Sequence, residues 1–144
     1  MKHLFTVATI ATLSAGALMA EDAITVPFDG SFEDATFAVE SAIIGKGLVI
    51  DYVSHVGDML NRTGADVGSA VKIFDAADIF LFCSAQVSRE VMEADPMNIQ
   101  HCPYAIFVTS RDGDVQIGHR DYPEGPMDKV EDLLMAIVAD AAGN

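Results

Sequence analysis

The sequence predicts one α+β domain, in which helices pack on a mainly antiparallel sheet, following a secretory signal peptide. Its 144 residues are enough for a single core once a leader is removed. Short runs rich in β-branched residues alternate with segments of helical periodicity. An Asp112-Gly113 step separates two apolar stretches, 104–110 and 115–119, which is the pattern of a β-hairpin.

Residues 1–20 have the features of a signal peptide. Lys2 supplies a basic start, an apolar run extends from Leu4 to Leu13, and small residues continue to Ala20. We expect cleavage after Ala20 or, three residues earlier, after Ala17, and the alternative is an uncleaved anchor. Removal would place the protein in the periplasm or outside the cell. It would leave one domain over residues 22–142 with no membrane segment.

The remaining elements follow from periodicity and from capping residues. A first strand at 23–28 precedes a helix capped by Ser31, which should end at the glycines around Lys46. The pattern then predicts a strand at 48–53, a helix at 54–67, one bulged or two short strands within 71–83, a helix from Ser84 to about Glu93, the hairpin, and a last helix from Met127. The buried side of that last helix should comprise Met127, Val130, Leu134, Ile137 and Ala141.

The charge of the chain is strongly acidic. It has 22 acidic and 8 basic residues, and removal of the leader takes away one lysine and no acid, leaving a net charge near −15. Nucleic acid is disfavoured as a partner because its phosphates require a basic surface. A basic electron carrier or a metal ion would be attracted by this field, although solubility alone also explains it.

Four segments together resemble the domain-of-unknown-function 302 family. They are Phe28-Asp29-Gly30-Ser31-Phe32, Gly45-Lys46-Gly47-Leu48-Val49, Cys83-Ser84-Ala85 and Cys102-Pro103-Tyr104. The resemblance covers residues 22–142. It implies a β-α-β(4)-α fold like that of TATA-binding protein and dimerisation through the sheet. The commoner family form has Cys-Asn-Pro at the first cysteine and Pro-Cys at the second. The family name implies no activity.

The two cysteines, Cys83 and Cys102, are the main functional candidates. In an oxidising compartment two cysteines suggest a disulfide, which would stabilise this interval by about 3 kcal/mol if the two Cα atoms lie within reach. The alternatives are two separate packed thiols or a functional thiol site. Ser84 begins a helix, so the helix dipole would favour a thiolate at Cys83 modestly.

A metal site is a further alternative. His55, Cys83, His101 and Cys102 could supply a soft nitrogen and sulfur set suited to copper, zinc or haem iron. The spacing matches no known metal motif, and adjacent His101 and Cys102 would face opposite ways in a regular strand. We expect any pocket to lie between the sheet and residues 55–68, with Met59, Tyr104 and His101 at its rim, although Met59 also fits a core position.

Other residues favour structural roles. His119 shares a strand face with Val115 and Ile117, which suggests a partly buried histidine with satisfied hydrogen bonds. The sequence has no phosphate-binding glycine loop, no Gly-x-Ser-x-Gly motif and no Cys-x-x-Cys-His motif. A hydrolase, a nucleotide enzyme and a c-type cytochrome are therefore disfavoured.

The leading hypothesis is a non-enzymatic accessory or binding protein of the periplasm, acting as a homodimer. Its sharper form is a copper or haem carrier for an electron-transfer or sulfur-oxidation system. The alternative is a thiol-disulfide redox enzyme or scavenger that uses Cys83 and Cys102 as a reversible pair. A purely structural partner subunit is the third interpretation.

Overall fold

The computed structural model describes residues 23–143, and the expected signal peptide lies outside them. Its centre is a five-stranded antiparallel sheet with strand order β1-β5-β4-β3-β2. The strands are β1 (Ala23–Phe28), β2 (Val49–Ser54), β3 (Ala76–Cys83), β4 (Tyr104–Arg111) and β5 (Asp114–Arg120). The α+β class and the antiparallel sheet are confirmed.

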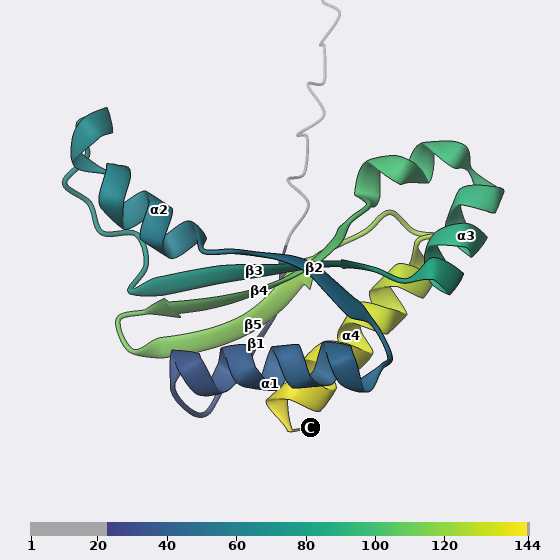
Figure 1. The fold of residues 1–144 in the computed structure, drawn as a ribbon, viewed down its shortest axis with the longest axis horizontal. Helices are drawn as coiled ribbons and strands as arrows, with labels where there is room; N and C mark the ends of the chain where they lie inside the picture. The colour runs from purple at the N-terminus through teal and green to yellow at the C-terminus, as the bar shows by residue number, and fades with distance from the viewer. Residues whose placement is uncertain (1–22, 144) are drawn as a thin grey trace, which may run out of the picture.

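Helices cover one face of this sheet. The helices are α1 (Phe32–Gly45), α2 (Val56–Thr63), α3 (Ala85–Ala94) and α4 (Asp128–Ala142), with short 3₁₀ helices η1 (Ala65–Val67) and η2 (Pro96–His101). Figure 1 shows α1 and α4 along one side of the sheet, α2 on the opposite side near one end of the sheet, and α3 beyond the other end. Since α1 and α4 form the helical layer, α2 and α3 are additions between strands.

The core lies between the sheet and the α1–α4 layer. Phe80, Phe82, Ile106 and Ile117 point from the sheet into this layer and are buried. The helical side of the core comprises Ala35, Val39 and Ile43 of α1, and Met127, Val130, Leu134, Ile137, Val138 and Ala141 at or within α4. All five residues expected on the buried side of the last helix are therefore in the core.

The hairpin and two helix starts form as their local sequences predict. Asp112 and Gly113 have φ values of 54° and 88°, the positive angles that a two-residue type I′ turn requires. Ser31 accepts a hydrogen bond from the Asp34 N–H in a reciprocal capping box. Ser84 accepts one from the Val87 N–H at the start of α3.

Two element predictions were wrong in detail. Val71 and Ile73 are exposed and lie in no strand, because pairing with β4 begins only at Ala76, opposite Ser110. The segment 71–83 thus contains a single strand, β3, which begins at Ala76. The helix expected over residues 54–67 is divided into α2 and η1 at Gly64, whose Cβ position would lie 3.3 Å from the Ser69 carbonyl oxygen.

The second face of the sheet carries apolar side chains that no helix of residues 23–143 covers at its centre. We call it the open face, and cross-strand pairing assigns to it Val49, Tyr52, Ile79, Leu81 and Phe107. Val49 is 76% exposed and Tyr52 is 63% exposed. Within the same residues, no helix has both the length and the apolar character needed to cross a bilayer.

Candidate thiol site

Sheet register brings the two cysteines to one place. Cys83 is the last residue of β3, and Cys102 lies between η2 and β4. Because Phe82 is paired with Tyr104, the end of β3 lies beside the start of β4. The two Sγ atoms are 2.7 Å apart, both partly buried, and both cysteines are free thiols in the structure. We call these two residues the thiol pair.

Local backbone structure holds each thiol in position. Ser84 turns the chain from β3 into α3 directly after Cys83 and caps that helix. Asp95 accepts a hydrogen bond from the Met97 N–H and begins η2, and the Cys102 N–H closes η2 by donating to the Ile99 carbonyl oxygen at 3.1 Å. A cis peptide bond joins Cys102 to Pro103, after which β4 begins.

The electrostatics of the thiol pair oppose a thiolate at Cys83. Burial, the hydrogen bond and charge of Cys102, and the carboxylate of Asp51 raise the pKa of Cys83 to about 12. The Tyr104 backbone N–H acts in the other direction and is outweighed. Any modest thiolate stabilisation from the helix dipole is therefore outweighed at Cys83, which is protonated at neutral pH.

Tyr104 anchors the strand beside the thiol pair. Its side chain is fully buried, and its hydroxyl lies 3.0 Å from the Ser88 hydroxyl of α3. Burial raises the pKa of Tyr104, and the hydrogen bond with Ser88 opposes the shift. Tyr104 therefore joins β4 to α3 through the core and does not stand at the edge of a pocket.

The structure does not bring the other predicted ligands to the sulfurs. His55 Nδ1 lies 2.8 Å from the Asp78 carboxylate near the start of β3, five residues before Cys83, which corresponds to about 16 Å along a strand. The His101 ring contacts Tyr122 edge-on, with ring centroids 5.6 Å apart. In residues 23–143 no three His, Cys, Asp or Glu side chains form a group that could hold a metal ion.

Met59 is also away from the sulfurs and outside the core. It is 42% exposed on α2, where its carbonyl oxygen and sulfur both contact the Thr63 hydroxyl. The core position expected for Met59 is wrong because α2 packs against the sheet through Gly57. A Cβ there would lie 2.4 Å from the Ala77 backbone nitrogen, so the close approach requires glycine.

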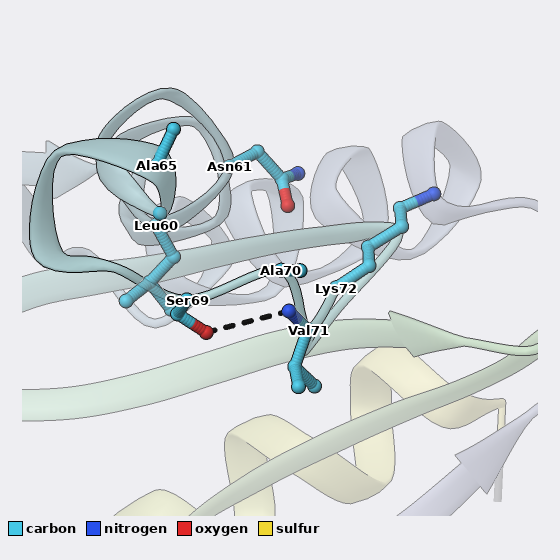
Figure 2. A pocket seen from close by; sticks show the side chains of 8 residues that line it. Leu60, Asn61, Ala65, Ser69, Ala70, Val71 and Lys72 are labelled. Carbon is cyan, nitrogen blue, oxygen red and sulfur yellow. Dashed lines mark hydrogen bonds between the residues drawn. The ribbon is translucent and has the colours of Figure 1, made fainter.

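A cavity does lie beside α2, where the predicted pocket was placed, but with other residues around it. Figure 2 shows its lining, in which Ser69 accepts a hydrogen bond from the Val71 N–H and Lys72 extends at one side. The cavity has a volume of about 440 Å³ and is lined by Leu60, Asn61, Gly64, Ala65, Ser69, Ala70, Val71 and Lys72. Neither Met59 nor Tyr104 lines it, so the expected pocket rim is not assembled.

One feature of the site, the position of Asp51, has no clear sequence signal. Asp51 is the extra residue where the β2–β3 register shifts between Ile50 and Tyr52, and this places its charge near Cys83. On β5, His119 is 1% exposed, more deeply buried than the partial burial expected, and its Nδ1 donates to the Arg120 carbonyl oxygen at 2.7 Å. Its Nε2 has no hydrogen-bond partner within residues 23–143, so the expectation of satisfied hydrogen bonds was wrong.

Comparison with known proteins identifies the family. The family model described as "Domain of unknown function DUF302" matches residues 24–141. This chain belongs to the DUF302 family. No curated protein matches the sequence.

One solved structure extends the comparison to the fold. The crystal structure of an uncharacterized conserved DUF302 protein from Bacillus stearothermophilus is 16% identical, with a TM-score of 0.67. The alignment covers 83% of this chain and 97% of the other. At this identity the match shows a shared fold, which in both chains is that of a DUF302 domain.

Proposed function

We propose that this DUF302 protein is an exported, non-enzymatic accessory protein that binds its ligand at the thiol pair. The observation that carries the proposal is the contact between the two Sγ atoms, at 2.7 Å and partly open to solvent. Two such sulfurs form a soft ligand site for a metal ion. The protein would carry copper or haem iron for an electron-transfer or sulfur-oxidation system.

The electrostatics support binding over catalysis. A catalytic thiol needs a thiolate near neutral pH, whereas the pKa of Cys83 is raised to about 12. A metal ion removes this obstacle because it displaces the proton from the sulfur that it binds. Cys83 is therefore placed beside a second sulfur without being activated for nucleophilic attack.

The open face supports the homodimer that the family resemblance implies. Exposed Val49 and Tyr52 stand beside Leu81 and Phe107 on a surface that is apolar in an otherwise acidic chain. A second copy would bury these side chains, and such patches mark association surfaces. The net negative charge favours a basic electron carrier as the physiological partner.

The alternative is a thiol-disulfide redox enzyme, which the sulfur contact itself favours. Reduction of insulin or of a glutathione-mixed disulfide by the full chain, in the presence of a reducing system, separates the two functions. We expect no catalytic turnover beyond that of free dithiol. Repeated turnover that disappears in Cys83→Ser and Cys102→Ser would contradict the accessory role and establish the redox enzyme.

A further inference from the structure

We propose that the thiol pair is a two-coordinate copper(I) site, in which Cys83 Sγ and Cys102 Sγ are the only protein ligands. This inference rests on the proposed binding function and names its ligand. Thiolates are the soft ligands that select copper(I) among first-row metals. The two sulfurs already lie in contact, so binding requires their side chains to rotate apart and admit the ion, without rearrangement of strands.

The neighbouring nitrogen ligands are engaged elsewhere. The His101 ring, although adjacent to Cys102 in sequence, contacts the ring of Tyr122. His55 is paired with Asp78 near the opposite end of β3. The pair therefore offers copper two sulfurs, whereas structural zinc takes four ligands in a tetrahedron. Haem iron needs an apolar cavity beside its axial ligand, and neither Cys83 nor Cys102 lines the cavity beside α2.

The reaction is an exchange of protons for metal. Two thiols and one copper(I) ion give a bis-thiolate complex of charge −1 and two released protons, and no atom is oxidised or reduced. The complex lies at the start of α3, a ten-residue helix whose N-terminal dipole favours negative charge. The Asp51 carboxylate opposes this negative charge, which should favour release of the copper to a second thiol protein.

Proton release makes the binding dependent on pH. Because two protons leave when the bis-thiolate complex forms, the apparent affinity for copper(I) should rise with pH. Oxidation to a disulfide removes both ligands. Copper binding therefore requires the reduced pair, and the oxidised chain should bind none at this site.

The test is an anaerobic titration of the reduced full chain with copper(I), in competition with bathocuproine disulfonate. We expect one copper(I) per chain and two protons released. Cys83→Ser and Cys102→Ser should each weaken binding at least a hundredfold. His55→Ala and Met59→Leu are matched controls at the other candidate ligands and should bind as the parent does. X-ray absorption of the loaded chain should show two sulfur neighbours.

Three results would overturn the copper site, and the first two concern the variants and the spectrum. They are unchanged affinity in the cysteine variants when circular dichroism shows them folded, and a nitrogen neighbour in the X-ray absorption spectrum. A reduced chain that binds no copper would likewise refute it while leaving the accessory role intact. Turnover in the insulin assay would instead refute the accessory role, so the two failures are distinguishable.

Discussion

Gly118 of β5 lies directly opposite Phe107 of β4, and the end of the phenylalanine ring occupies the space that a side chain at position 118 would need. A Cβ at Gly118 would stand 2.6 Å from Phe107 Cζ and 2.6 Å from the Ile24 carbonyl oxygen. Both distances are shorter than real contacts of this kind. The glycine thus allows an aromatic side chain to lie flat over the open face between β4 and β1.

Gly118→Ala should therefore destabilise the domain. Overpacking of this kind costs about 1–3 kcal/mol, and one of the clashes is with backbone, which cannot rotate away. Urea unfolding followed by circular dichroism gives the free energy. Gly45→Ala is the control, since nothing lies within 4 Å of its Cβ position at the end of α1, and there we expect no loss. Equal effects at both positions would contradict the packing described for Phe107.

The open face predicts an effect on association. Val49→Lys or Tyr52→Lys places a charge on the exposed apolar surface and should convert the expected homodimer to monomers, because burying an unpaired charge is costly. Sedimentation equilibrium measures the change. Phe37→Lys provides the control, since Phe37 is 71% exposed on α1, away from this face. If only the Phe37→Lys protein became monomeric, the dimer interface would lie elsewhere than on the open face.

The raised pKa of Cys83 predicts a loss of stability at alkaline pH. In the reduced protein the folded thiol keeps its proton up to a pKa of about 12, whereas the unfolded thiol releases it near the ordinary pKa of 9.0. The associated stability is present below about pH 9 and is lost as the pH rises toward 12. Chemical unfolding of the reduced protein at several pH values measures this loss. Cys83→Ser should show a shallower decline, and an unchanged decline would contradict the assignment.

His119 predicts the opposite dependence at acidic pH. Burial lowers the pKa of His119, and the nearby Asp121 carboxylate and the Arg120 carbonyl only partly oppose this shift. The unfolded histidine takes up a proton near pH 6.5, and the folded one resists it. Stability should fall below pH 6.5 by at most about 1.4 kcal/mol per pH unit. His119→Leu should flatten the curve, and an equally steep decline in that variant would contradict the assignment.

The hydrogen bond between Tyr104 and Ser88 predicts coupling between β4 and α3. Loss of either hydroxyl, in Tyr104→Phe or Ser88→Ala, should cost about 0.5–1.5 kcal/mol. The double variant should cost less than the sum of the two, because both single changes remove the same bond. Thermal or urea unfolding of the parent protein, the two single variants and the double variant gives the double-mutant cycle. Strict additivity would show that the hydroxyls do not interact.

Local signals in the sequence were sufficient for most of the fold. The Asp112-Gly113 turn, the Ser31 and Ser84 caps and the 3.6-residue spacing in α4 each act within a few residues, and the structure shows all of them. The errors fall where tertiary contacts override local pattern. The apolar residues at 71–74 look like a strand, yet their neighbour Ser69 bonds to the Val71 N–H and the segment stays outside the sheet.

The candidate site was predictable only in part, for a related reason. Both cysteines stand at element boundaries, which the sequence shows, and antiparallel pairing of β3 with β4 then places them together. The sequence pattern could not exclude His55 from the ligand set. The residue with which His55 pairs, Asp78, lies 23 residues away in sequence. The β2 bulge that places Asp51 near Cys83 likewise depends on register, and register is set by the whole sheet.

Ligand binding at the thiol pair requires the sulfurs of Cys83 and Cys102 to be neighbours in solution. The most direct measurement is mass spectrometry of the reduced chain after brief exposure to a stoichiometric dithiol oxidant, followed by alkylation and peptide mapping. We predict rapid loss of two hydrogen masses in a monomeric chain and one linked peptide pair containing Cys83 and Cys102. Recovery of both cysteines alkylated, or of chains cross-linked only to one another, would contradict the account.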